Sequence, residues 1–260
     1  MKVKDIIDIL DKKYPLRYAY DWDNCGLLIG DMDMEVEKCL TTLEVTDEVI
    51  SEAVDNGANL IISHHPVIFS GMKRITTENF KGAQIIRLIR NSIAVISLHT
   101  NFDIAKGGTN DSFCKALDIR NTEIFELISE NDGEKTGMGR IGEIDTVDLK
   151  TLALKAKKTL GLDKISVVGD LSSKVSKVAV CTGSGADYYE LAKAKGVDCL
   201  LTGDMKYHTA QDALHEGVNI IDCSHFGSEE MFKDVMYDFI KANGIEVIKT
   251  QKCRNPIVSF

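Results

Sequence analysis

Residues 38–63 read KCLTTLEVTDEVISEAVDNGANLIIS, and residues 177–202 read KVAVCTGSGADYYELAKAKGVDCLLT. The two stretches align without a gap at a constant offset of 139 residues (177 minus 38). Each begins with an apolar run, continues into a polar helical segment that stops at Gly57 or Gly196, and ends in a second apolar run. Short apolar runs of this kind predict strands covered on both faces, as in parallel sheets. The repeat therefore predicts two related α/β lobes.

The rest of the chain alternates helical and apolar segments in the same way. A further apolar strand follows each repeat, at 93–98 and at 218–223. Outside the repeats we expect helices over 3–13, 148–160 (capped by Asp148) and 228–242, and short strands between 121 and 146. This alternation predicts an α/β protein whose mixed or parallel sheets are flanked by helices. We place the first lobe at 1–125 plus 226–260 and the second at 126–225.

Composition indicates an ordinary globular protein in a reducing compartment. The 260 residues are 44% hydrophobic and 27% charged, and no apolar stretch approaches the ~20 residues that span a bilayer. The seven cysteines are odd in number and form no C-x-x-C pair. Several fall inside predicted strands, where a buried thiol is expected. We therefore expect a cytoplasmic protein with no membrane partner.

The net charge of the chain argues against nucleic acid as a partner. The formal charge is −9 at pH 7. Binding to the phosphates of nucleic acid normally needs a basic face. We therefore do not expect a nucleic-acid partner.

Polar side chains follow the predicted strands. His64 and His65 come directly after one apolar run, and Pro66 biases His65 toward an extended backbone. Successive side chains on an extended segment point to opposite sides, so these two imidazoles suit two neighbouring ions better than one. Three other predicted strands end in pairs of the same kind: His99 with Asp103, Asp204 with His208, and His225 with Glu229. Ligands bind at the carboxyl ends of strands in such sheets, which predicts a metal site enclosed between the lobes.

The donor types indicate the metal. Imidazoles and carboxylates without thiolates suit zinc, iron(II) or manganese and disfavour a purely structural zinc. A pair such as His225 and Glu229, four residues apart, shares one face if that turn is helical. Each pair alone is common by chance, and Asp103 alone fits a surface aspartate. Their shared position at strand ends favours the ligand interpretation, and Glu229 has the reach to bridge two ions.

Other polar residues are candidate substrate contacts: Asp23, Asn24, Arg140 and His208. Asp23 and Asn24 could instead close a turn, and His208 could be a metal ligand. The glycine-rich segment 136–142 does not open a helix after a strand, as a dinucleotide-binding loop must. We interpret it as backbone turns that present Arg140 to an anion.

Six motifs together identify a family. In chain order they read DNCGLLIG, SHHP, LHTNFD, GMGRIGEI, TGDMKYH and SHFGSEE. The set resembles the Nif-three-like family, whose members include GTP cyclohydrolase 1 type 2 homologues and are dinuclear-metal hexameric toroids. The resemblance extends over nearly the whole chain and matches the minimal form of the family, without an inserted domain. It implies a homohexameric ring built as a trimer of dimers.

The resemblance also implies roles for individual residues. His65 and Asp103 would hold one ion, and His64 and His225 the other, with Glu229 bridging both. The cofactors would be two divalent ions per chain, of zinc, iron or manganese. His99 then has no ligand role and becomes the candidate catalytic proton carrier.

The function expected on this basis is dinuclear-metal-dependent hydrolysis. The family name suggests GTP, attacked at C8 of the guanine by a metal-activated water, with release of formate. His99 would move the proton. Two alternatives stay open: a dinuclear phosphoesterase that releases phosphate, and a metal-handling or regulatory ring without turnover.

Overall fold

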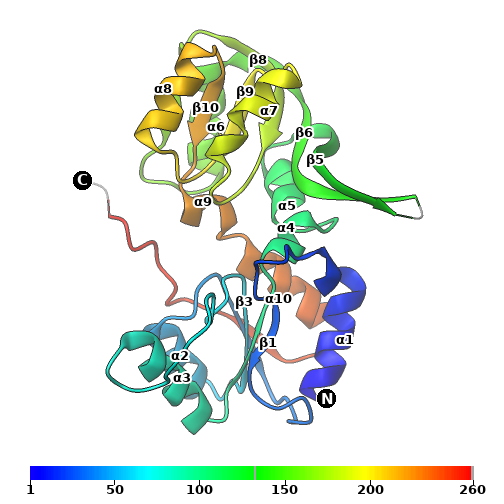
Figure 1. The fold of residues 1–260 in the computed structure, drawn as a ribbon, viewed down its shortest axis with the longest axis vertical. Helices are drawn as coiled ribbons and strands as arrows, with labels where there is room; N and C mark the ends of the chain where they lie inside the picture. Colours follow the sequence, from blue (N-terminus) through cyan, green and yellow to red (C-terminus); the bar gives the residue numbers. More distant parts are fainter. Residues whose placement is uncertain (132, 259–260) are drawn as a thin grey trace. The chain divides into compact units, whose positions relative to one another are not determined.

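The computed structural model describes residues 1–131 and 133–258 and divides into two compact units (Figure 1). The first unit consists of Met1–Ala105 and Phe232–Arg254. The second consists of Lys106–Met231 and the segment that begins at Asn255. The predicted lobes change at 125 and 226, whereas the chain crosses between the compact units at 105 and 231. Residues 132, 259 and 260 of the predicted lobes lie outside the described residues.

A five-stranded sheet forms the centre of the first unit, in the order β1-β4-β3-β2-β11. The strands are β1 (Gly26–Ile29), β2 (Cys39–Thr42), β3 (Leu60–Ser63), β4 (Ala94–Ser97) and β11 (Val247–Lys249). All neighbours are parallel except β1, which runs antiparallel to β4. The helices are α1 (Val3–Lys13), α2 (Asp47–Asp55), α3 (Phe80–Arg90), α4 (Thr100–Ile104) and α10 (Phe232–Ala242), with a 3-10 turn at Leu16–Tyr18.

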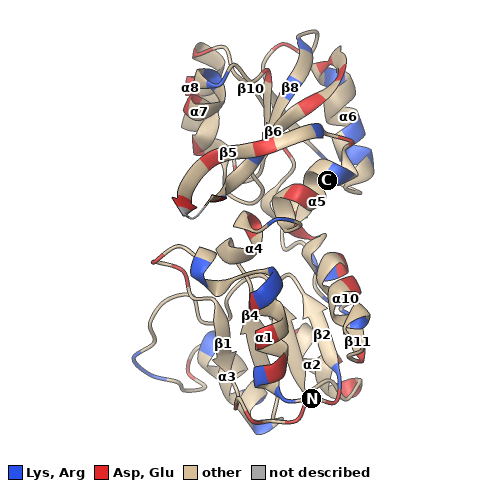
Figure 2. Ribbon diagram, turned by 90° about the vertical axis from the view of Figure 1, so that its right-hand side faces the viewer, with Lys and Arg blue, Asp and Glu red and all other residues tan. Residues whose placement is uncertain are grey.

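Apolar stripes on the helices cover both faces of this sheet. Ile6 of α1 and Met236 of α10 share one core with alternate strand residues such as Leu60 and Ile62. Figure 1 shows α2 and α3 on the opposite side from α1 and α10. Burial on both faces explains why each strand residue from Leu60 to Ser63 is buried. Along α1 and α10, acidic and basic residues stand side by side on the outer surface (Figure 2).

The second unit contains a six-stranded sheet in the order β5-β6-β8-β9-β10-β7. The strands are β5 (Arg120–Asn131), β6 (Glu134–Asp148), β7 (Ser166–Val168), β8 (Lys174–Val180), β9 (Cys199–Thr202) and β10 (Asn219–Asp222). β8, β9 and β10 are parallel, and β6 and β7 are antiparallel to their neighbours in this trio. The helices are α5 (Thr109–Ala116), α6 (Leu149–Thr159), α7 (Tyr189–Ala194), α8 (Tyr207–His215) and α9 (His225–Glu229), with a 3-10 turn at Ala186–Tyr188.

The internal repeat is confirmed by the register of the sheets. Cys39 pairs with Leu60 in the first unit, and Val178 pairs with Cys199 in the second. Adding 139 to the first pair gives the second pair. Both units are α/β layers with mixed sheets flanked by helices, as the sequence predicts.

Two predicted elements were wrong. The short strands expected between 121 and 146 are one long hairpin, β5 and β6. The glycines of the segment 136–142 lie within β6 and are not turns: a Cβ on Gly137 would lie 2.0 Å from the Glu126 carbonyl oxygen, so Gly137 permits close backbone approach within the strands. The expected helix 228–242 is two helices, α9 and α10, which meet where the chain crosses between units. The expected cap is confirmed, since Asp148 accepts a hydrogen bond from the Thr151 amide.

Two predictions from composition can also be compared with the structure. All seven cysteines are free thiols, and the four that were expected in strands (Cys39, Cys181, Cys199 and Cys223) are buried. Among the described residues, no helix has both the length and the apolar character that crossing a bilayer would need.

Candidate metal centre

The donor residues of the first unit follow two neighbouring parallel strands. His64 and His65 come directly after β3, and their backbone amides donate to the carbonyls of Thr42 and Leu43. These hydrogen bonds continue the ladder between β2 and β3, so the sheet itself sets the position of both imidazoles. His99 comes after β4 and precedes α4. His64 is completely buried, and its ring packs against the Phe232 ring at 5.1 Å between centroids.

Each of these three histidines has its Nδ1 bound to an oxygen atom. His64 bonds to the Leu98 carbonyl at 2.8 Å, His65 to the Glu44 carboxylate at 3.0 Å, and His99 to the Asp23 carboxylate at 2.9 Å. A carbonyl or carboxylate accepts only from a protonated nitrogen, which assigns the proton to Nδ1 in the neutral ring. The lone pair then lies on Nε2, and this is how proteins usually orient metal-binding histidines.

The ring nitrogens converge. One ligand atom from each of His64, His65 and His99 lies within 4.8 Å of the other two. Asp103, on α4, places Oδ1 3.6 Å from Nε2 of His64. Nitrogen and carboxylate donors gathered in this way fit a divalent ion of the zinc, iron or manganese type.

The second unit carries a smaller set of donors of the same kind. Nδ1 of His225 lies 2.6 Å from an Asp204 carboxylate oxygen, and Nε2 lies 3.0 Å from Oε2 of Glu229. Asp204 and Ser224 both have positive φ, of 51° and 61°. Strained backbone of this kind persists where the surrounding structure fixes it, often at functional sites.

Glycine at position 183 makes room for the buried carboxylate of Glu229, which is 3% exposed. Gly183 has a φ of 69°, and a Cβ there would lie 2.2 Å from Oε1 of Glu229. Any other residue would have to displace this carboxylate or the backbone beneath it. This close contact explains why the first glycine of the segment CTGSG, residues 181–185, is a glycine.

The carboxylates that hold the histidines are anionic at neutral pH. Burial would raise the pKa of Asp23, yet hydrogen bonds from the His99 ring and from Thr100 hold it below its usual range. Burial likewise opposes ionisation of Glu44, but His65 and Lys81 lower its pKa. Both carboxylates therefore orient a neutral imidazole and would stabilise positive charge beside it.

A thiol lies beside Asp23. Sγ of Cys25 is 3.2 Å from the Asp23 carboxylate, and burial, reinforced by this negative charge, raises the pKa of Cys25 to about 12. The donors that the first unit gathers are imidazole nitrogens and the Asp103 carboxylate.

The predicted substrate contacts Asp23 and Asn24 lie in the same unit as the three histidines. Asp23 bonds to His99 and accepts from both the amide and the hydroxyl of Thr100, at 3.0 and 2.6 Å. Asn24 donates from Nδ2 to the Ile68 carbonyl at 2.6 Å and so joins two loops. The role of either residue toward a substrate stays a prediction.

The predicted contacts Arg140 and His208 belong to the second unit. Arg140 is buried and forms a two-point ion pair with Asp111, at 2.5 and 3.2 Å, and also donates to the Gly139 carbonyl. His208 is exposed in the first turn of α8, edge-on to Tyr207 at 5.4 Å between centroids. Their contact with a substrate stays a prediction.

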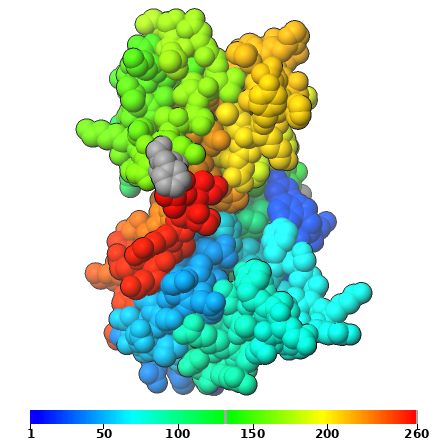
Figure 3. All heavy atoms as spheres, turned by 90° about the vertical axis from the view of Figure 1, so that its left-hand side faces the viewer, coloured from blue at the N-terminus to red at the C-terminus, as the bar shows by residue number. Residues whose placement is uncertain are grey.

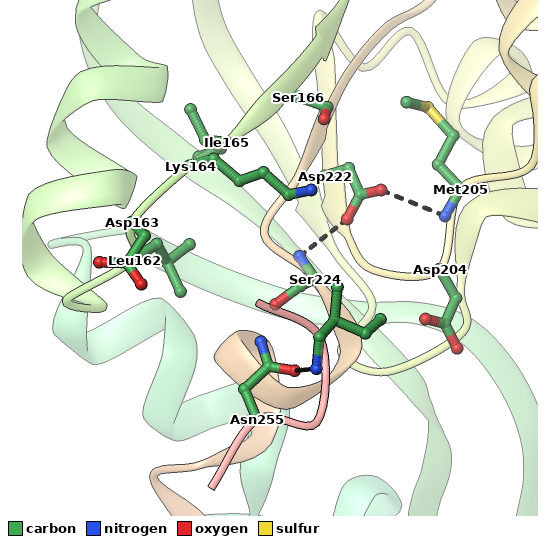
Figure 4. A pocket seen from close by; sticks show the side chains of 11 residues that line it. Leu162, Asp163, Lys164, Ile165, Ser166, Asp204, Met205, Asp222, Ser224 and Asn255 are labelled. Carbon is green, nitrogen blue, oxygen red and sulfur yellow. Dashed lines mark hydrogen bonds between the residues drawn. The ribbon is translucent and has the colours of Figure 1, made fainter. Parts of the chain in front are cut away.

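A polar cavity of about 280 Å³ lies beside the His225 loop in the second unit (Figure 4). Asp204 and Ser224 line it, together with Lys164 and Asp222. Asp222 accepts hydrogen bonds from the amides of Ser224, at 2.7 Å, and Met205, at 3.3 Å. These bonds explain how the strained loop before α9 keeps its form.

Sequence reasoning missed Glu44 as a partner of a candidate ligand. Glu44 follows β2 as a polar residue after an apolar run, which is the signal that identified the other strand ends. It passed unnoticed because its position in the other repeat is Gly183, which carries no side chain.

Comparisons of sequence agree with the resemblance. The profile of the Duf34/NIF3 (NGG1p interacting factor 3) family matches residues 1–256. A Clostridium acetobutylicum protein named GTP cyclohydrolase 1 type 2 homolog is 37% identical over 231 residues, which cover 88% of this chain and 85% of the relative. A Streptococcus pneumoniae protein of the same name is 33% identical over 266 residues, covering 98% of each chain.

Solved structures share the fold along the whole chain. A Bacillus cereus protein related to NIF3 superposes with a TM-score of 0.95 at 28% identity, covering 100% of this chain and 99% of that one. A Staphylococcus aureus hypothetical protein superposes with a TM-score of 0.93 at 31% identity and the same coverage. Sequence and fold therefore point to one family.

Proposed function

The chain belongs to the Duf34/NIF3 family, and we propose that it is a metal-dependent hydrolase. One observation carries the proposal. The four candidate histidines (His64, His65, His99 and His225) all have Nδ1 bound to an oxygen acceptor, which leaves the lone pair that can coordinate a metal on Nε2. A single such pair is common in protein cores. Four of them at strand ends, together with Asp103 and Glu229, indicate a site prepared for cations.

We assign the ligands as the family resemblance implies. His65 and Asp103 would hold one divalent ion and His64 and His225 a second, and Glu229 would serve both. The ions are zinc, iron(II) or manganese, which this donor set suits. When bound, such a pair would supply an acidified water and positive charge for a developing oxyanion. The pairing of His225 with Glu229 within the second unit supports their acting together.

His99 is the proposed proton carrier. Asp23 binds Nδ1 and remains anionic, so Nε2 can accept a proton while the carboxylate stabilises the resulting imidazolium. A ring nitrogen of His99 also lies close enough to His64 and His65 for His99 to be a ligand. His99→Gln separates the two roles: a proton carrier loses turnover and keeps its metal, whereas a ligand loses metal as well.

GTP is the proposed substrate because curated relatives are named GTP cyclohydrolase 1 type 2 homolog. Hydrolysis at C8 of the guanine opens the five-membered ring and releases formate. Release of phosphate would instead identify a phosphoesterase. Labile metal with neither product would identify a metal-handling or regulatory ring. The homohexamer implied by the resemblance is part of the proposal and is tested by the mass of the particle in solution.

The deciding experiment measures metal per chain on protein purified without added metal, followed by formate and phosphate released from GTP. We expect about two ions per chain and formate. His64→Ala should lose metal and turnover together, while His215→Ala, an exposed histidine at the end of α8, should keep both. His225→Ala should lower the metal content if the second unit contributes a ligand. Fewer than one ion per chain after reconstitution would refute the site.

A further inference from the structure

The only tryptophan of the chain is exposed. Trp22 keeps 59% of its surface accessible and Phe69 keeps 53%, and their ring centroids lie 6.0 Å apart. Large aromatic side chains are usually buried, so an exposed pair in contact marks a surface with a binding role. Figure 3 shows the chain near residue 20, in blue, against the chain near residue 70, in cyan, at the molecular surface.

These rings adjoin the candidate metal centre within the first unit. The centroids of Trp22 and Phe69 each lie 6.3 Å from that of His99, and both rings meet the imidazole edge-on. Tyr20 stacks on Trp22 at 5.5 Å, with 17° between the ring planes. We call Tyr20, Trp22 and Phe69 the aromatic platform.

The segment that orients His99 also holds the aromatic platform in place. Asp23 bonds to His99 on one side of Trp22 in the sequence. The next residue, Asn24, donates to the Ile68 carbonyl and thereby fixes the loop that carries Phe69. The exposed rings are therefore not loose side chains, because these part-buried hydrogen bonds hold the residues directly after Trp22 and directly before Phe69.

We propose that the aromatic platform binds the planar heteroaromatic ring of the substrate beside His99. Aromatic side chains stack on any flat ring through dispersion and quadrupole attraction, with no need for a particular hydrogen-bond pattern. A ring seated here would lie next to His99, which belongs to the donor cluster. The inference rests on the proposed function, because it assumes that this substrate reacts at the metal centre, and it adds the residues that recognise the ring.

The single tryptophan makes binding directly measurable. We would titrate the metal-loaded protein with GMP and with ribose 5-phosphate while following tryptophan fluorescence, and measure GMP affinity by calorimetry. GMP should quench the fluorescence saturably, and ribose 5-phosphate, which lacks the base, should not. Trp22→Ala and Phe69→Ala should each weaken GMP binding by about tenfold or more, with metal content unchanged.

Phe80→Ala is the matched control. Phe80 is an equally large and even more exposed aromatic of the same unit (69% accessible), at the start of α3 with Lys81 over its ring. Its removal should leave GMP affinity unchanged. No saturable GMP binding, equal binding of ribose 5-phosphate, or full GMP affinity in Trp22→Ala would each overturn the inference. A change of oligomeric mass in Trp22→Ala with full GMP affinity would overturn it too, by assigning the surface to contact between copies.

Failure of the proposed function can be told apart from failure of this inference. GMP binding that depends on Trp22, without formate or phosphate from GTP, would refute the hydrolase and leave the aromatic platform standing. Turnover of GTP that is unaffected by Trp22→Ala would refute the aromatic platform and leave the hydrolase standing.

Discussion

The two units use one scaffold to present different side chains at corresponding strand ends. Counted along the repeat, His64 and His65 of the first unit correspond to Gly203 and Asp204 of the second. A candidate ligand in one unit thus corresponds to a supporting residue in the other, because Asp204 binds Nδ1 of His225. Gly203 is also required for space, since a Cβ there would lie 2.6 Å from the His225 amide nitrogen. The strands set where side chains emerge, and single loop residues decide which of them are candidate metal ligands.

The histidines that follow β4 and β10 differ by one residue in their distance from the strand. Ser63 pairs with Ser97 at the end of β4, and the corresponding pair in the second unit is Thr202 with Asp222 at the end of β10. His99 stands two residues after Ser97 and precedes α4, whereas His225 stands three residues after Asp222 and is the first residue of α9. The predicted correspondence of the two His-x-x-x-carboxylate motifs holds for the strand ends and not residue by residue.

The largest effect on stability is expected from Arg140→Ala in the second unit. The change leaves the partly buried Asp111 without its guanidinium partner, and the loss should lie at the lower end of the about 3–5 kcal/mol in the free energy of unfolding that breaking a buried ion pair costs. Chemical denaturation measures this directly. Arg120→Ala is the control, because Arg120 on β5 pairs with Asp145 at the exposed surface and its loss should change little. A variant of Arg140 with normal stability but weakened substrate binding would favour the anion-contact prediction.

Gly183→Ala tests the space that the second unit reserves for Glu229. The positive φ alone costs on the order of 1–2 kcal/mol, and the collision with the carboxylate adds to it and should lower the metal content. Gly196→Ala has a similar φ of 62° and open space around its Cβ, so it should show the backbone cost with metal retained. Equal metal content in the two variants would mean that Glu229 does not depend on this glycine.

The smallest effects are expected from the carboxylates that hold the histidines. Glu44→Gln and Asp204→Asn should each reduce metal affinity by roughly 10–100-fold, measured by competition with a chelator. The second unit contributes one candidate histidine and the first contributes three, so Asp204→Asn should have the larger effect of the two. Glu48→Gln on α2 is the control for charge. A larger loss in Glu44→Gln would reverse the ranking of the two units.

Sequence patterns predicted the layers of this fold because strand burial and repeat spacing are local properties. Candidate ligands were visible for the same reason: His64 and His65 directly follow an apolar run, and Asp103 stands four residues after His99, which follows the next one. The β5–β6 hairpin was missed because glycine has two uses, and the pattern around Gly137 could not tell a turn from close packing of strands. Trp22 was not recognised because its neighbour Phe69 is brought to it by a long-range hydrogen bond, from Asn24 to Ile68.

The first unit is assembled from two distant segments of chain, and this imposes an order on its maturation. Residues 106–231 are contiguous, so the second unit can complete its sheet while residues 232–254 are still to be synthesised. Until those residues arrive, the first unit lacks β11 and the α10 side chains of its core, including the Phe232 ring that covers His64. The imidazole at the centre of the donor cluster is therefore enclosed last. A nascent chain halted before Phe232 would lack the ring that packs against His64, so enclosure of this imidazole would be among the final steps of biogenesis.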